Sequence, residues 1–345
     1  MDVRLAPEQV ALRQTARKLV AGHGPHSVAD LDDGDRAARL DAAVAAAGWR
    51  ELRDVGEGNL PLASGVEVAI VAEELGRGAA DVAFIGPVLA ADLARRAGRP
   101  ELAGTTIALS PDLRRLGHAT GTDAEGDLVA VDATSSTAAL VLRDGAGGIG
   151  LEQCPLRPPV ARTDLTRAVA GVDLSRASVL EGTQALSPDD LAAWSALALA
   201  ALSADLVGVM RGAVELARDY ATVREQYGSP IGAFQSVQHL IADAHVATEG
   251  AYSLTLHAAW AADALEPSAA LLAAREAKAY ASRAARSVCE TAIQVHGGIG
   301  NTWECMAHVY LRRALHSSDI LGGADASLAY VLAQHGLEVG AHGLR

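Results

Sequence analysis

Residues 217–243 read ARDYATVREQYGSPIGAFQSVQHLIAD, and this stretch holds the junction that sets the architecture of the chain. The segment YGSPIG concentrates glycine and proline, the residues that end helices and form turns. We therefore expect Arg224 and Tyr227 at the end of one helix and Gln235 at the start of the next. Taken alone, Arg224 is a cation that stabilises a helix C-terminus.

The helix before this junction is predicted to be very long. It opens with SPDDLAAW, in which Ser187 can cap the helix and Pro188 suits its first turn. No Gly-Pro break intervenes before Glu225, so the helix has about 39 residues and a length of about 58 Å. Three further helical stretches follow, at residues 234–265, 268–296 and 302–321. Four long helices with short connections predict a bundle.

Two other zones precede the bundle. Up to about residue 95, apolar residues recur at helical spacing in EQVALRQTARKLV, ARLDAAVAAAGW and VEVAIVAEELGRGAA. From about residue 105 the runs TTIALS, DLVAVDA, AALVLR and ASVLEG are typical of short strands separated by turns. The expected fold is α+β, with a helical domain at 1–100, a small β-rich middle domain at 101–185 and the helical bundle at 186–345.

Composition excludes several classes of function. The formal net charge of -13 and the lack of a basic patch argue against nucleic-acid binding. Three cysteines without CxxC spacing and histidines without ligand spacing predict neither a disulfide framework nor a metal site. No run approaches 18 apolar residues without a charge, and the first 20 residues lack a signal-peptide pattern. We expect a cytoplasmic protein that does not enter a membrane.

The segment QVHGGIG at residues 294–300 has two readings. A dinucleotide-binding glycine loop follows a strand, whereas these glycines follow a predicted helix. Gly297 and Gly298 are therefore either a helix stop that uses a left-handed glycine or a place where a flat ligand approaches the backbone.

Together, the junction and the QVHGG segment resemble the acyl-CoA dehydrogenase family. Tyr220, Arg224, Tyr227 and Gly228 match the family's Y-x-x-x-R-x-x-[FY]-G pattern, and Gln235 and QVHGG follow in the family's order. The order of helices, β-rich zone and helices is also similar to its three-domain plan. The resemblance implies FAD as cofactor and the dehydrogenation of an acyl-CoA thioester between its α and β carbons.

The resemblance also implies roles for individual residues. Arg224 would meet the FAD pyrophosphate, and Tyr227 and Gln235 would lie on its flavin or adenosine side. The QVHGG segment would lie at the adenosine and pyrophosphate; its residues are Gln294, Val295, His296, Gly297 and Gly298. An arginine offers a fixed fork of donors to phosphate oxygens, and glycines let a ligand approach the backbone.

The family's catalytic base is missing. Its usual Glu lies about 23 residues beyond the double glycine, where this chain has Leu321, and an alternative base position on the long helix falls at Ala198 or Leu199. The family's flavin-side loop is not recognisable in residues 107–123, where Pro111 is the one possible relic. Leucine cannot take a proton. Asp319 and Asp325 are close in sequence and are candidate substitutes, with Asp319 two residues from the expected base position, and no residue is assigned as catalytic.

The chain keeps the residues that imply cofactor binding and lacks the base. In this combination it resembles the short subunit of heteromeric acyl-CoA dehydrogenases of actinobacteria. This reading predicts a larger, Glu-bearing homologue as partner, a bulky or sterol-derived acyl-CoA as substrate, and an acceptor such as an electron-transfer flavoprotein. Two alternatives remain: a self-sufficient dehydrogenase or oxidase with a non-standard base, and a non-catalytic helical scaffold.

Overall fold

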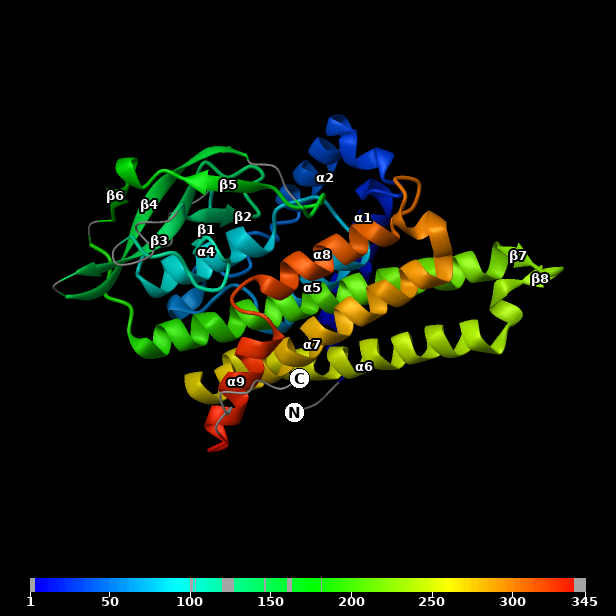
Figure 1. The fold of residues 1–345 in the computed structure, drawn as a ribbon. Helices are drawn as coiled ribbons and strands as arrows, with labels where there is room; N and C mark the ends of the chain where they lie inside the picture. The colour runs from blue at the N-terminus through cyan, green and yellow to red at the C-terminus, as the bar shows by residue number, and fades with distance from the viewer. Residues whose placement is uncertain are drawn as a thin grey trace.

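The computed structural model describes residues 4–99, 102, 104–119, 127–145, 147–159, 163–180 and 182–337. Four helices form the N-terminal part (Figure 1). The third begins with a capping box, because Ser64 accepts from the N–H of Glu67 while the Glu67 carboxylate accepts from the N–H of Ser64. The helices are α1 (Pro7–His23), α2 (Gly34–Ala46), α3 (Gly65–Arg77) and α4 (Ile85–Arg96).

Six strands follow in the middle of the chain: β1 (Thr105–Leu109), β2 (Val129–Val131), β3 (Ala138–Gly145), β4 (Gly148–Pro159), β5 (Val169–Val172) and β6 (Ser178–Val179). Their order is β3-β1-β2-β5-β4-β6, and β3 also pairs with β4, so five strands close into a small barrel. Only the β1–β3 pair is parallel among these pairings. Small apolar side chains such as Ala108, Ala130 and Val141 fill its interior, as expected for a narrow barrel.

Two of these strands, β4 and β5, were not predicted from the sequence. β4 is the longest strand of the barrel, although it contains Pro155, Pro158 and Pro159, which lack the N–H that a ladder needs. Its pairing shifts register between Leu156 and Pro159, and this irregularity accommodates the prolines. β5 has only four residues and a glycine at its third position, so its sequence signal is weak.

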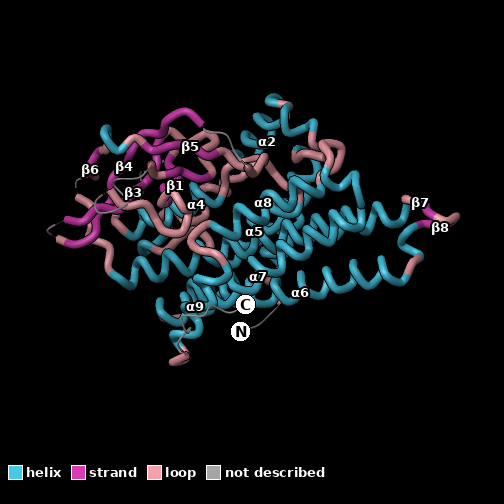
Figure 2. Tube along the Cα trace, viewed as in Figure 1, coloured by secondary structure: helices cyan, strands magenta, loops and turns pink. Residues whose placement is uncertain are grey.

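The C-terminal part is helical, as Figure 2 shows by colour. It contains α5 (Pro188–Val223), α6 (Gln235–Ala264), α7 (Pro267–His296), α8 (Ala307–Asp319) and α9 (Ala324–Gln334). Ser187 caps α5 as expected, and α5 ends at Val223, two residues before the predicted end. The fourth helix of the predicted bundle is present, but it is shorter than the expected stretch at residues 302–321. Residues 297–301 form a 3-10 turn, and α8 begins only at Ala307.

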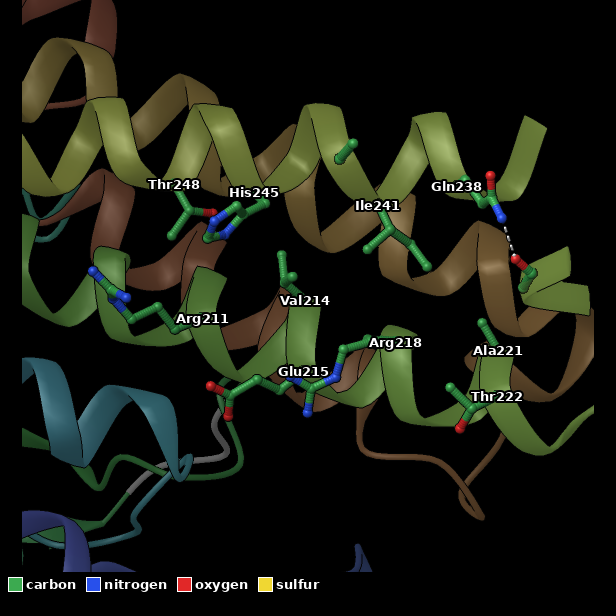
Figure 3. Close-up of a pocket in the computed structure, with 12 residues that line it drawn as sticks. Arg211, Val214, Glu215, Arg218, Ala221, Thr222, Gln238, Ile241, His245 and Thr248 are labelled. Carbon is green, nitrogen blue, oxygen red and sulfur yellow. Dashed lines mark hydrogen bonds between the residues drawn. The ribbon is translucent and has the colours of Figure 1, made fainter. Parts of the chain in front are cut away.

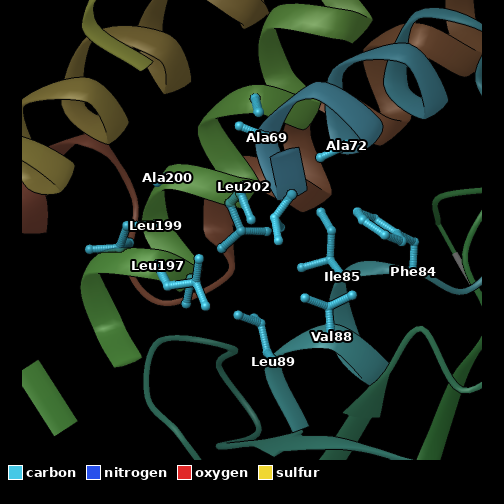
Figure 4. Packing of buried hydrophobic residues seen from close by; sticks show 14 of the residues in the cluster. Ala69, Ala72, Phe84, Ile85, Val88, Leu89, Leu197, Leu199, Ala200 and Leu202 are labelled. Carbon is cyan, nitrogen blue, oxygen red and sulfur yellow. The ribbon is translucent and has the colours of Figure 1, made fainter. Parts of the chain in front are cut away.

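α5 lies at the centre of the molecule and packs against α3, α6, α7 and α8. It is long and apolar enough to cross a membrane, but 89% of its most apolar window is buried inside the protein, as in a core helix of a folded domain. Leucines of α5 meet Phe84, Ile85 and Leu89 of the α4 region (Figure 4). α3 approaches α5 closely at Gly208, where a Cβ would lie 1.9 Å from the Glu73 carbonyl oxygen.

Candidate functional site

The end of α5 and the start of α6 form one half of the candidate site. Arg224 ends α5, with its N–H donating to the Tyr220 carbonyl at 2.9 Å and its carbonyl accepting from Ile231 at 2.7 Å. Two short strands, β7 (Glu225–Gln226) and β8 (Ser229–Pro230), then make a hairpin. Tyr227 and Gly228 form its two-residue turn with positive φ of 54° and 77°, the geometry of a type I′ turn. Sequence and turn chemistry together thus fix where Arg224 lies.

The end of α7 forms the other half. Gly297 has φ 65° and ψ -143°, a backbone conformation that is essentially restricted to glycine. A Cβ added to Gly297 or Gly298 would meet no atom within 4 Å, so this stretch of backbone faces open space. Gly297 therefore stops the helix, as one of the two interpretations predicts. The pair also leaves its backbone exposed, which the approach of a ligand would require.

A ring contact joins the two halves. Tyr220 stacks on His296 with ring centroids 4.4 Å apart and planes 24° apart. His296 is buried, and its Nδ1 lies 2.7 Å from the Ala292 carbonyl oxygen, so Nδ1 carries the donated proton. Figure 1 shows the hairpin and the turn after α7 at the end of the bundle that lies away from the barrel.

We call this surface the tip and define it by its exposed members: Arg224, Tyr227, Gln235, Gln294, Gly297 and Gly298. The remaining two predicted residues, Val295 and His296, are buried beneath it. Tyr227 is 94% exposed. The guanidinium of Arg224 and the amides of Gln235 and Gln294 make no hydrogen bond or ion pair with the described residues. A guanidinium fork without a described partner, at the same end of the bundle as open glycine backbone, fits the pyrophosphate part of a dinucleotide such as FAD.

A groove of about 520 Å³ lies beside the tip, between α5 and α6 (Figure 3). Val214 and Ile241 form its apolar part, while Arg211, Glu215 and His245 contribute polar groups. At the end nearest the tip, Gln238 Nε2 donates to the Gly232 carbonyl at 2.9 Å. The groove extends the tip into a larger concave surface.

Leu321 lies at the opposite side of the bundle, where the barrel meets the helices. It is buried, and its backbone has φ 58°, an uncommon value for a branched residue. Its N–H donates to the Leu113 carbonyl at 2.8 Å, and its own carbonyl accepts from Arg275 Nη1 at 3.2 Å. Both backbone groups of Leu321 are bonded within the protein, and the contact with Leu113 joins the barrel directly to the expected base position.

Lys278 fixes the turn that carries Leu321. Its Nζ is fully buried and donates to the carbonyls of Ser317, Ser318 and Ile320 at 2.5, 3.0 and 3.1 Å. These carbonyls belong to the C-terminal end of α8, whose last acceptors have no partner within the helix. Burial lowers the pKa of Lys278 to about 7. Lys278 therefore holds the end of α8, and it is a positioning group for the turn.

The candidate substitutes for the base do not converge on Leu321. Asp319 and Asp325 are exposed, and neither lines the cavity beside Leu321. Ala198 and Leu199 are buried core residues of α5 without an ionisable group. The described residues thus place no carboxylate at either family position, and Asp319 has the surroundings of a solvated surface acid.

A buried cluster of charged residues joins the barrel to the bundle. This cluster was not predicted from the sequence. Asp205 of α5 pairs with Arg167, which follows the barrel strand β4, at 2.9 Å and with Arg313 of α8 at 2.7 Å. Ser317 Oγ donates to Asp205 Oδ2, the oxygen that also contacts Arg167, at 2.7 Å. Burial alone would raise the pKa of Asp205, but the two arginines outweigh it and hold that pKa below its usual range. A single Asp within the apolar run LALAALSADLVGVM is the signal that points to such a buried pair.

A cavity of about 270 Å³ lies at this domain junction. Its wall combines Leu321, leucines and Trp194 of the core with three arginines: Arg114 and Arg115 from the turn after β1, and Arg275 from α7. Trp194 donates from Nε1 to the Leu89 carbonyl, and the rest of its side chain is part of the apolar wall.

Comparison with known proteins gives consistent matches. Residues 196–337 match the model of the family "Acyl-CoA dehydrogenase, C-terminal domain". Acyl-CoA dehydrogenase IpdE2 of Mycobacterium tuberculosis is 32% identical over 327 residues, which cover 91% of this chain and 93% of IpdE2. Among solved structures, the steroid ACAD Tcur3481-Tcur3483 is 25% identical with a TM-score of 0.74, covering 95% of this chain and 98% of the other. The ChsE4-ChsE5 complex from Mycobacterium tuberculosis has the same fold, with a TM-score of 0.78 at 22% identity, and covers 97% of this chain and 99% of the other.

Proposed function

The chain belongs to the acyl-CoA dehydrogenase family of oxidoreductases acting on CH–CH bonds, and from this premise we propose that it completes an FAD site in a larger homologous subunit. In this proposal the partner supplies the flavin-side residues and the Glu base, and this chain supplies the tip. The complex dehydrogenates an acyl-CoA thioester between the α and β carbons.

One observation supports the proposal: the described residues include an exposed arginine without a polar partner at the tip and no carboxylate at the family's base positions. Arg224 at the tip has no partner among the described residues, whereas the base position holds Leu321 with its backbone fully bonded. An unpaired guanidinium costs little at the surface, where water solvates it, and it remains free to bind a phosphate brought by another chain.

Each residue of the tip has a defined task in this proposal. Arg224 binds the pyrophosphate through its guanidinium fork, and the amides of Gln235 and Gln294 orient the neighbouring polar atoms. Gly297 and Gly298 let the cofactor approach the backbone, while the Tyr220–His296 stack keeps the two halves of the tip together. The cofactor itself, when bound, accepts the hydride that leaves the β carbon. The α-proton is taken by the partner's carboxylate.

The relatives support a partner and a bulky substrate. One similar solved chain belongs to a steroid ACAD, and another belongs to the ChsE4-ChsE5 complex, which contains two kinds of subunit by its name. We propose a cytoplasmic hetero-oligomer acting on a bulky, sterol-derived acyl-CoA, with an electron-transfer flavoprotein as electron acceptor. The exposed Tyr227 and Trp303, 94% and 64% exposed, and the groove between α5 and α6 offer surface for the partner.

Flavin absorbance of the purified protein tests this proposal. We expect the chain expressed alone to be colourless, and the same chain co-expressed with a homologue that has Glu at the position of Leu321 to be yellow and active. A yellow, active protein from the single chain would show a self-sufficient enzyme. A protein that stays colourless with every such homologue from its own genome would show a scaffold.

A further inference from the structure

Arginine side chains gather on the wall of the cavity at the domain junction. Arg114 and Arg275 both line it, and neither forms an ion pair with any residue that the structure describes. Among the residues that the structure describes, no Asp or Glu lines the cavity. This is unexpected in a chain with 42 acidic and 29 basic side chains, where an acidic partner is easy to supply.

Other arginines of this molecule form ion pairs with aspartates. Arg53 bonds both Asp92 and Asp263, Arg167 bonds Asp205, and Arg313 bonds Asp205 as well. These arginines are buried at contacts between elements, as Arg275 is in part. Unpaired buried charge is costly, so a partly buried arginine without a carboxylate points to an anion from outside the chain.

Arg275 in particular has unused donors. Its Nη1 donates to the Leu321 carbonyl at 3.2 Å and lies 3.5 Å from Ser327 Oγ, and its guanidinium lies over the Tyr330 ring. Its Nε is buried and has no hydrogen-bond partner among the residues that the structure describes. Burial lowers the pKa of Arg275, with only Tyr330 opposing that effect. The guanidinium is thus fixed in place by one carbonyl and one ring, while part of its donor set stays unsatisfied.

Apart from the arginines and Ser195, whose hydroxyl donates to the Leu191 carbonyl at 2.7 Å, the described part of the wall is apolar. Leu116 and Leu142 come from the barrel, and Leu191 and Leu199 come from α5. A volume of about 270 Å³ is slightly below the range of roughly 300–1,000 Å³ that drug-sized ligands occupy. Such a cavity is too small for a coenzyme A thioester or a dinucleotide. It fits a short apolar body that ends in an anion.

We propose that this cavity binds a small monocarboxylate, with its carboxylate between Arg114 and Arg275 and its apolar body against the leucines. The planar guanidinium matches a carboxylate through paired hydrogen bonds. Leu321 makes the site possible, because a carboxylate in place of its side chain would itself pair with the arginines. Because Leu321 replaces the base, the arginines of the cavity remain available to an anion from outside the chain. The site does not depend on the proposed role of the tip.

Binding of hexanoate to the full chain, alone and in its complex, tests the proposal by calorimetry and by thermal shift. We expect saturable binding in the millimolar range and weaker binding of neutral hexanamide by about tenfold or more, because a charge-assisted hydrogen bond is lost. Arg114→Gln and Leu321→Glu should each weaken hexanoate binding by about tenfold or more. Arg286→Gln, on an exposed part of α7, should bind hexanoate as the unaltered chain does.

Two outcomes would overturn the proposal: no hexanoate binding up to about 50 mM, well above the expected millimolar range, or equal binding of hexanoate and hexanamide. Arg114 is exposed, so its substitution tests the site even where a change at Leu321 disturbs folding. Arg224→Ala should leave hexanoate binding unchanged, which separates failure of this site from failure of the tip. Competition between hexanoate and inorganic phosphate distinguishes a carboxylate site from a general anion site; equal affinity for the two would contradict the carboxylate assignment.

Discussion

The two ends of the helical bundle treat their polar side chains in opposite ways. At the domain junction, Asp205, Arg167 and Arg313 are buried, and their charges are paired within 3 Å. At the tip, Arg224 and the two glutamines are exposed and make no polar contact with the described residues. The first arrangement is expected of a group that holds domains together, and the second is expected of a surface that receives something from outside.

The difference follows from solvation. A buried ion must be paired, because the protein interior does not replace the water that it loses. An exposed ion needs no partner, so its position has to be explained by the backbone that carries it. At the tip, that backbone is a tight hairpin turn and a glycine conformation that other residues avoid.

The largest predicted effect comes from breaking the junction. Asp205→Ala leaves two buried arginines without their shared carboxylate, and we expect the free energy of unfolding to fall by about 3–5 kcal/mol. Urea denaturation followed by circular dichroism measures the change. Asp219→Ala is the matched control, because Asp219 pairs with Arg218 at the exposed surface and such pairs contribute little. A loss for Asp205→Ala no larger than that of the control would show that the cluster does not hold the domains.

The same cluster predicts a pH dependence. The pKa of Asp205 is lowered in the folded protein, so the stabilisation is fully present above the unfolded pKa of about 3.9 and is lost as the pH falls toward the folded pKa. The free energy of unfolding should therefore decrease as the pH is lowered below about 4. Asp205→Asn should reduce the steepness of this decrease. An identical slope in both proteins would mean that Asp205 does not titrate with unfolding.

At the tip, the predicted effect is on the cofactor and leaves stability unchanged. Arg224→Ala removes a charge-assisted bond to phosphate worth about 1.5–3 kcal/mol, so FAD should bind the assembled complex about 10-fold to 100-fold more weakly. Flavin released on dialysis measures this, and Arg286→Ala serves as the control on another exposed surface. If both variants keep their flavin equally, Arg224 is only the cation that ends α5.

The smallest effect is predicted for Asp319, the acid two residues before the expected base position. Asp319→Asn should leave turnover of the complex within a few-fold, since Asp319 is exposed and lies outside the cavity beside Leu321. Removal of a true general base would cost about 100-fold to 10,000-fold. Steady-state kinetics with an artificial electron acceptor decide between the two. A collapse of the maximal rate with normal folding and flavin content would make this chain a dehydrogenase in its own right.

Local signals predicted much of the fold. Ser187 and Pro188 start α5 as expected, Gln235 is the first residue of α6, and Gly297 ends α7. The three-zone order and the α+β class also agree with the structure. Each of these features depends on a few neighbouring residues, which a sequence displays directly.

Features that depend on distant residues were not predictable in this way. The Tyr220–His296 stack joins residues 76 positions apart (296 - 220), and the contact between Leu113 and Leu321 crosses from the barrel to the bundle. The prolines of β4 prevented its prediction as a strand. The sheet accommodates them through a shift in register, which no local sequence pattern indicates. Asp205 was visible in the sequence, but its arginines come from segments far along the chain.

The ratio of FAD to protein chains in the assembled complex tests the central claim most directly. The tip of this chain completes one site in the partner, whereas its own junction holds Leu321 and a barrel contact in place of a base. The account therefore predicts one FAD for each pair made of this chain and its partner, measured by flavin absorbance against total protein after gel filtration. One FAD for every chain would contradict it, because this chain would then hold a cofactor with its own barrel.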